Sequence, residues 1–258
     1  MLVMTPRTIS LARTMAEIEG AGVALHYDER GDGASVLVIH GLASDAAAWA
    51  EPLQELAAAG ARAIAYDRRG YGASGAPEPY VATTVQEQSQ DAAALLEGLR
   101  AAPALLVGDG FGALVALELL VRRPELATGA VLADPPLFAF VPDATEMLAA
   151  QRQLLEDALR QGGPAAGVQA WLGDEVSAER LRRARASYLG FFADYAGQSS
   201  WSPSRRELRS IAAPVAVVTG TASAPHIVAA AEALGGLLGD VRLTRDGDVL
   251  AAARALLA

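Results

Sequence analysis

An apolar segment with a glycine-rich turn at its centre, ALLVGDGFGALVALELL (residues 104–120), constrains the fold more than any other part of the sequence. Its first part is short and continuously apolar, as expected of a strand that is buried on both faces. Its last part has the length and composition of a buried helix. The glycines between them allow a sharp turn and close packing of strand and helix. The segment therefore predicts the strand–turn–helix unit of an α/β fold.

Short apolar runs alternate with Ala- and Leu-rich helical patterns along most of the chain. Strands are expected at residues 22–31, 35–41, 61–67, 129–134 and 213–220, and in the segment DVRLTRDG (240–247). Gly60 and Pro124 end two of the intervening helical patterns. This order is typical of a mostly parallel central sheet that helices flank on both faces. A chain of 258 residues, 52% of them hydrophobic, is long and apolar enough to bury such a core.

Residues 136–208 interrupt the alternation, because they contain helical patterns without strands between them. We expect a core made of residues 1–135 and 209–258, with residues 136–208 inserted as a helical lid. The insertion is rich in aromatic residues, among them Phe138, Trp171 and Tyr195. Two interpretations stay open: these side chains pack the lid onto the core, or they line an apolar pocket beneath it.

Missing residue types exclude several kinds of chemistry. The chain has no Cys, which excludes a thiolate nucleophile, a disulfide and a Cys-ligated zinc site. All 21 basic residues are Arg, which excludes a Schiff-base lysine. The net charge of −9 argues against nucleic-acid binding. The three His residues lack metal-ligand spacing, and the turn at 108–112 lacks the spacing of a dinucleotide-binding loop, so we expect no metal and no cofactor.

The sequence also bears on location. No apolar run reaches the roughly 18 residues that cross a membrane. The first residues, MLVMTPRTISLARTMAEIEG, lack the apolar centre of a signal peptide. A cytoplasmic protein without membrane contacts is therefore expected, and the oligomeric state is not indicated.

Several segments, taken together and in this order, resemble the α/β-hydrolase fold superfamily over nearly the whole chain. They are VLVIHG (36–41) followed by Trp49, YDRRGYGASG (66–75), LLVGDGFGALVALELL (105–120), VLADPP (131–136) and APVAVVTG (213–220) before a last strand. The resemblance implies the α/β-hydrolase fold, with a mostly parallel sheet and a helical lid. It also implies a catalytic triad whose three positions can be checked.

All three triad positions are altered in this sequence. The nucleophile elbow of the family reads G-x-S-x-G, and Gly110 stands at its centre. The acid position falls in residues 220–223, which end in Ser223 and contain no carboxylate. Asp248 falls where the resemblance implies the base histidine. This degenerate triad argues against hydrolysis by a Ser-His-Asp relay.

The resemblance further implies that the oxyanion hole is retained. Its donors would be the backbone N–H groups of Leu42 and Phe111, which can stabilise a developing negative charge. His40 either belongs to the binding site or hydrogen-bonds the backbone of this turn. His226 either faces the ligand or is a surface or helix-capping residue. Together with Gly110 and Trp171, these residues form the expected substrate-binding set.

Three carboxylates are candidates for proton transfer. Asp109 precedes the centre of the elbow, and a shifted register would make it a covalent nucleophile like the elbow Asp that some branches of the superfamily use. Asp134 ends a strand at the expected active-site edge, but an Asp before Pro is also a common turn former. Asp248 could act as a general base if apolar surroundings raise its pKa, or it could cap the helix that follows.

These observations favour a non-hydrolytic enzyme that acts on a largely apolar, carbonyl-containing small molecule by cyclisation, isomerisation or elimination. One alternative is a catalytically inactive pseudoenzyme that binds a small-molecule ligand. A second alternative is a hydrolase with relocated catalytic residues. A serine such as Ser223 within hydrogen-bonding reach of His226 or His40 would favour that second alternative.

Overall fold

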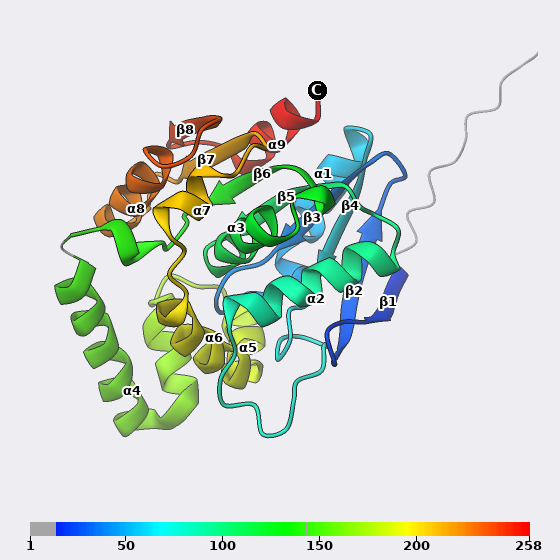
Figure 1. Cartoon of the computed structure of the whole chain (residues 1–258). Helices are drawn as coiled ribbons and strands as arrows, with labels where there is room; N and C mark the ends of the chain where they lie inside the picture. Colours follow the sequence, from blue (N-terminus) through cyan, green and yellow to red (C-terminus); the bar gives the residue numbers. More distant parts are fainter. Residues whose placement is uncertain (1–13, 143) are drawn as a thin grey trace, which may run out of the picture.

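In the computed structural model, which describes residues 14–142 and 144–258, eight strands of the described residues form one sheet (Figure 1). They are β1 (Thr14–Glu19), β2 (Ala24–Arg30), β3 (Ala34–Ile39), β4 (Ala61–Tyr66), β5 (Ala104–Asp109), β6 (Ala127–Ala133), β7 (Val215–Thr219) and β8 (Val241–Arg245). Their order is β1-β2-β4-β3-β5-β6-β7-β8. β2 is antiparallel to β1 and β4, and all other neighbours are parallel. The predicted fold class is confirmed.

The helices are α1 (Ala50–Ala58), α2 (Val85–Gly98), α3 (Phe111–Arg122), α4 (Ala144–Leu172), α5 (Ala178–Ala186), α6 (Tyr188–Ser200), α7 (Arg205–Arg209), α8 (Pro225–Gly235) and α9 (Val249–Leu257). Short 3-10 turns occur at Ala46–Trp49, Pro124–Leu126 and Phe138–Phe140. No helix in the described part of the chain is long and apolar enough to span a membrane.

Alternate residues of the central strands pack against helices on opposite faces of the sheet. Leu37 and Ile39 of β3 belong to the core shared with α2, α3 and α8, whereas Val36 and Val38 belong to the core shared with α1 and α9. This is the reason that the central strands read as continuous apolar runs. β1 has no counterpart among the predicted strands, because a short strand that pairs with one neighbour leaves little periodic signal.

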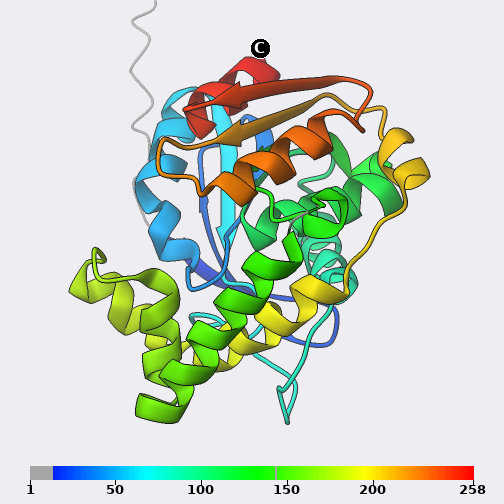
Figure 2. The same ribbon diagram turned by 90° about the vertical axis from the view of Figure 1, so that its left-hand side faces the viewer.

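Residues 136–208 contain helices and, in their described part, no strand. Their helices α4, α5 and α6 lie together beyond one end of the sheet (Figures 1 and 2). They share a small apolar core that includes Leu155, Val168 and Phe191. α4 is kinked at Gly162 and Gly163, just before Pro164. The division into a core and a lid stays a prediction, and residues 1–13, where no signal-peptide pattern was found, lie outside the described residues.

Gly112 sets how closely α3 can approach β3. A Cβ atom at this position would lie 2.0 Å from the carbonyl oxygen of Ile39 and 2.9 Å from that of His40. Both oxygens belong to rigid backbone, so no side chain can move away to make room. The interface between α3 and the sheet therefore requires glycine here.

We expect Gly112→Ala to lower the free energy of unfolding by about 3 kcal/mol, because the added methyl group overpacks the interface. Urea unfolding followed by circular dichroism measures the change. Gly239→Ala is the matched control, since a Cβ there meets no atom within 4 Å. The control should change the free energy of unfolding by less than about 1 kcal/mol. Equal losses for the two variants would contradict this account of the packing.

Candidate active site

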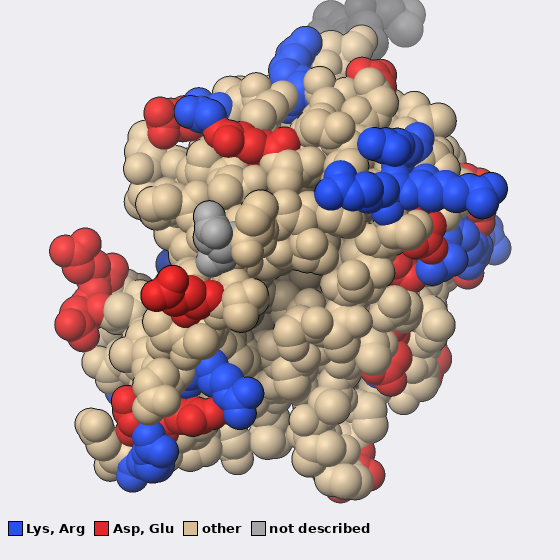
Figure 3. Space-filling model, turned by 60° about the vertical axis from the view of Figure 1, so that its left-hand side comes forward, with Lys and Arg blue, Asp and Glu red and all other residues tan. Residues whose placement is uncertain are grey.

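A pocket of about 300 Å³ lies where the carboxyl ends of β3, β5 and β6 face the helices of residues 136–208. Figure 3 shows a hollow on this side of the molecule with mainly uncharged atoms around it. The core contributes Gly41, Leu42, Asp109, Gly110, Phe111 and Asp134 to the pocket wall. Seven of the nine predicted site residues therefore line this pocket. Five come from the strand ends or the turns next to them, and two, Trp171 and His226, come from flanking helices.

The turn between β5 and α3 has the strained geometry expected of an elbow. Gly110 adopts φ 51° and ψ −116°, a conformation that side-chain-bearing residues rarely adopt, and its N–H donates to the carbonyl oxygen of Ala133 at 2.9 Å. Gly110 brings no side chain to the pocket, but Phe111 begins α3 at this point. The Phe111 N–H has no acceptor within the helix, so the turn presents this backbone donor to the pocket.

Asp109 is the carboxylate at the base of this pocket. Its side chain accepts a hydrogen bond from the backbone N–H of Gly41. Burial raises the pKa of Asp109 to about 6, and the negative charge of Asp134 adds to the shift. Three groups lower this pKa and so limit the increase: the positive charges of Arg180 and Arg68 and the hydrogen bond from the Gly41 N–H. Asp109 is therefore mostly ionised at pH 7 and is a stronger base than an ordinary aspartate.

Asp134 lies beside Asp109 in the pocket wall and is held by the chain that follows β7. The Ser223 hydroxyl donates to Asp134 Oδ1 at 2.5 Å and accepts a hydrogen bond from the Gly220 N–H at 2.7 Å. Asp134 has φ 44°, and its N–H donates to the carbonyl oxygen of Val218 at 2.9 Å. Ser223 is thus paired with a carboxylate, and the described residues show no hydrogen bond from it to His226 or His40.

His40 lies behind the pocket wall rather than in it. Its side chain is almost fully buried, its Nδ1 donates to the carbonyl oxygen of Gly41 at 2.9 Å, and its Nε2 accepts from the N–H of Arg68 at 3.0 Å. Burial lowers the pKa of His40 well below its usual range, with a smaller effect from the Arg68 charge. The expected contact of His40 with substrate is corrected here: a neutral His40 hydrogen-bonds the backbone and supports the turn.

The expected role of Asp248 as a proton-transferring carboxylate of the pocket is also corrected. Its carboxylate is exposed and accepts from the N–H groups of Leu250 at 2.7 Å and Ala251 at 3.1 Å. It is the N-cap residue of α9 and does not line the pocket. The preference of Asp for helix N-caps explains its presence in this sequence.

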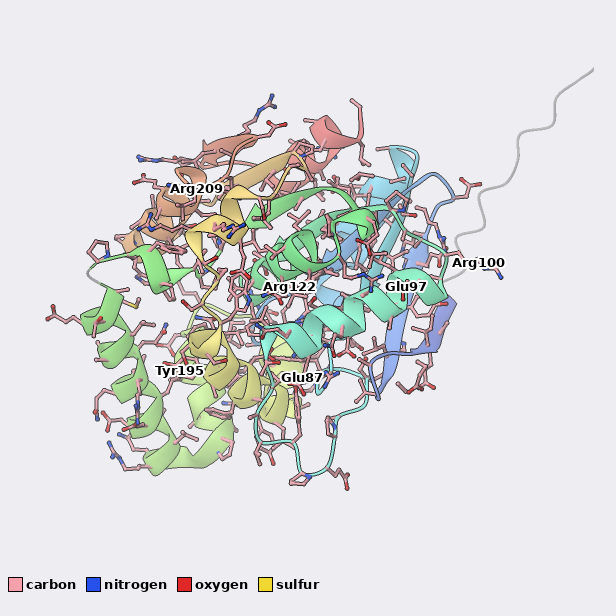
Figure 4. All side chains as sticks on the ribbon, viewed as in Figure 1. Glu87, Glu97, Arg100, Arg122, Tyr195 and Arg209 are labelled. Atoms are coloured by element: carbon pink, nitrogen blue, oxygen red, sulfur yellow. The ribbon has the colours of Figure 1, made fainter. Side chains whose placement is uncertain are left out.

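Two flanking helices bring further predicted residues to the pocket. His226, at the start of α8, lies half-buried against Phe138 with the ring centres 5.6 Å apart, and burial lowers its pKa. Trp171, at the end of α4, packs edge-on against the rings of Phe191 and Tyr195, with ring centres 5.6 and 5.7 Å apart. Figure 4 shows Tyr195 on α6. The aromatic residues of this region therefore do both things considered above: they pack the helices together and they line the pocket.

Gln151 and Gln198 line the same pocket from α4 and α6. Neither residue was predicted, because glutamines on helices that are otherwise partly polar form no recognisable pattern in the sequence. They add uncharged hydrogen-bonding groups to the pocket wall that contains the carboxylates. Pro136, Phe138 and Ile227 complete the wall.

Comparisons with known proteins agree with the fold and bear on the chemistry. The chain is 38% identical over 109 residues to a protein named epoxide hydrolase from Caballeronia sordidicola, a match that covers 42% of this chain and 33% of that protein. It is 28% identical over 126 residues to bifunctional epoxide hydrolase 2 of Sus scrofa, covering 49% of this chain and 23% of that protein. The matched stretches span less than half the length of these relatives.

These names contradict the expectation of a non-hydrolytic cyclase, isomerase or lyase. They equally contradict the inactive pseudoenzyme, since these relatives are named hydrolases. The expectation was wrong because it inferred the absence of hydrolysis from the residues at the three catalytic-triad positions alone. The altered triad itself stays a prediction, because the comparisons do not test which residues carry the reaction in this chain.

Solved structures extend the likeness to the whole described fold. An alpha/beta hydrolase from Sphaerobacter thermophilus has a TM-score of 0.74 at 21% identity, and the match covers 94% of this chain and 98% of that one. The model of the alpha/beta hydrolase family matches residues 36–256, which include every strand from β4 to β8 and the whole pocket wall. The chain therefore belongs to the alpha/beta hydrolase family.

Proposed function

We propose that this protein hydrolyses small, largely apolar esters or lactones, with Asp109 activating the attacking water and no covalent enzyme intermediate. The observation that carries the proposal is the position of the Asp109 carboxylate, in a pocket wall that also contains Leu42 and Phe111. A base and backbone donors thus share one small cavity. Relatives that are named hydrolases support the reaction type.

The backbone of Leu42 and Phe111 would bind the substrate carbonyl oxygen. Phe111 is the first residue of α3, so its N–H has no acceptor within the helix, and the positive end of the helix dipole adds to its effect. Donors that are fixed by the backbone need not reorganise as negative charge develops on the oxygen. Gly110 leaves the space above the turn free, where a serine side chain would otherwise stand.

Asp109 would then move the proton. It removes a proton from water while the water oxygen bonds to the carbonyl carbon, and the negative charge passes to the carbonyl oxygen. When the carbon–oxygen bond to the alcohol breaks, Asp109 returns the proton to the departing oxygen. The products are a carboxylic acid and an alcohol, and Asp109 is restored. The net charge of the pocket stays constant during this step. The negative charge only moves from the Asp109 carboxylate to the carbonyl oxygen, which the backbone donors bind.

The position of Asp109 in the turn favours this role over covalent attack. It precedes the apex residue Gly110, and its carboxylate is held by the Gly41 N–H. A base with a pKa near 6 is ionised at neutral pH and still accepts a proton readily. Phe138 and Trp171 give the pocket apolar walls that suit an uncharged acyl or alkyl group.

We expect Asp109 to titrate near pH 6 and Asp134→Asn to lower its pKa, because the charge of Asp134 raises the pKa of Asp109. Carboxyl carbon chemical shifts followed by NMR across pH 3–9 measure both values. Asp248→Asn is the matched control, since Asp248 lies outside the pocket. The assignment fails if Asp109 titrates like an ordinary aspartate or if Asp248→Asn changes its pKa as much as Asp134→Asn does.

We expect Asp109→Asn to reduce kcat/KM for p-nitrophenyl butyrate by roughly 100-fold or more, the usual scale for losing a general base. In the wild type, kcat/KM should rise with pH up to about 6 and then level off, because the base must be ionised. Asp248→Asn should keep the wild-type rate. Mass spectrometry of the enzyme during turnover should show no acyl adduct, and an adduct would overturn the water-activation mechanism.

A further inference from the structure

Arg68 is a fully buried arginine that contacts the backbone next to the proposed oxyanion donors. It follows β4, and its side chain has no solvent exposure. Nε donates to the carbonyl oxygen of His40 at 2.8 Å, and an Nη donates to that of Gly41 at 3.1 Å. One rigid guanidinium group thus holds two successive peptide carbonyls.

These two bonds determine where the next two N–H groups point. A trans peptide is planar, so its N–H points away from its C=O. The His40 carbonyl shares a peptide with the Gly41 N–H, and the Gly41 carbonyl shares one with the Leu42 N–H. Because both carbonyls face Arg68, both N–H groups face the opposite side, where the Gly41 N–H binds Asp109. Successive N–H groups on one side of the backbone form an anion-binding concavity.

The same guanidinium also touches the residue that supplies the second donor. Its central carbon lies 4.8 Å from the ring centre of Phe111 and 4.8 Å from that of Tyr71, so it is held between two aromatic rings. A shift of Arg68 would therefore disturb the His40–Leu42 turn and the start of α3 together. Both halves of the proposed oxyanion hole depend on one side chain.

Asp194 of α6 holds Arg68 in this position. Its Oδ2 lies 2.6 Å from an Nη of Arg68 and accepts from the Tyr71 hydroxyl at 2.8 Å, and its Oδ1 accepts from Gln88 Nε2 at 2.8 Å. Both charged side chains are completely buried. A buried ion pair contributes little net stability over apolar residues of the same volume, so stability alone is a weak reason for it. Its hydrogen bonds, by contrast, specify one geometry.

We propose that Arg68 and Asp194 are positioning residues that couple the packing of helix α6 to the geometry of the oxyanion donors. Asp194 belongs to residues 136–208, whereas the donors belong to the core, so the site is complete only when the two parts are docked. The kinetic consequence rests on the proposed hydrolase function. The geometric consequence, the direction of the Leu42 N–H, does not require turnover.

The test compares Arg68→Lys and Asp194→Asn with Glu118→Gln. Lysine keeps the charge opposite Asp194 but cannot hold two carbonyls in a fixed fork. Glu118 is a matched control, because it is also a buried carboxylate and also links the core to the insertion, accepting from Trp201 Nε1 at 2.9 Å. It lies on α3 beside Arg122, which Figure 4 shows, and none of its hydrogen bonds involves Arg68.

With p-nitrophenyl butyrate, we expect Arg68→Lys and Asp194→Asn to lower kcat roughly 10- to 100-fold with KM changed less than about threefold, the scale of a misplaced catalytic group. Glu118→Gln should keep the wild-type kcat even if its Tm falls. If Arg68→Lys does not fold, Tyr71→Phe removes one bond to Asp194 and should lower kcat in the same direction. Unchanged kcat in folded Asp194→Asn would overturn the proposal.

A binding experiment separates failure of this proposal from failure of the proposed function. Acetophenone carries a carbonyl group that the pocket cannot hydrolyse, and we expect it to shift the amide proton signals of Leu42 and Phe111 downfield in NMR spectra of the wild type. Asp194→Asn should reduce these shifts, whereas Glu118→Gln should not. Shifts in the wild type that Asp194→Asn reduces, without ester turnover, would refute the hydrolase but retain the coupling. Equal shifts in all variants would refute the coupling.

Discussion

The close approach of three backbone segments, at the end of β3, at the end of β5 and at the start of α3, is the constraint on which the rest of the site depends. Glycine makes this approach feasible. A Cβ at Gly108 would lie 2.5 Å from the carbonyl oxygen of Gly112, and a Cβ at Gly41 would lie 3.0 Å from that of Asp109. Because the backbones meet without side chains between them, the N–H of Gly41 can reach the Asp109 carboxylate. The packing of the fold and the chemistry of the pocket therefore share one origin.

The same arrangement makes Asp109 unfavourable for stability. Its folded-state pKa is raised, so between about pH 4 and pH 6 the folded protein binds more protons than the unfolded chain does. The free energy of unfolding then falls as the pH rises through that window, the opposite of the behaviour of a salt-bridged aspartate. A carboxylate placed only for stability would have a partner that lowers its pKa. A raised pKa makes the Asp109 carboxylate a stronger base, which is what a proton-transfer role requires.

Much of the fold could be predicted because its central strands are buried on both faces and its turns need glycine, which the sequence displays directly. The pocket positions of Leu42, Asp109 and Phe111 were implied by the resemblance to the family, and that of Asp134 was predicted from the strand that it follows. Gln151 and Gln198 could not be predicted, because their place in the pocket depends on how α4 and α6 pack rather than on a local pattern. For the same reason, no pattern connects Arg68 with Asp194, which lie far apart in the sequence and meet only in the folded protein.

The correction from non-hydrolytic to hydrolytic chemistry has a physical basis as well. Loss of the elbow side chain removes covalent attack, but hydrolysis needs only a nucleophilic water, a base and a place for negative charge on the oxygen. In this pocket the proposed base, Asp109, stands one residue before Gly110, and the backbone donors do not depend on which side chain the elbow carries. The space that Gly110 leaves beside Asp109 is where such a water could stand. In the proposed mechanism, a pocket that lacks the elbow nucleophile and keeps its surroundings would therefore follow another route of hydrolysis and still have the groups that hydrolysis needs.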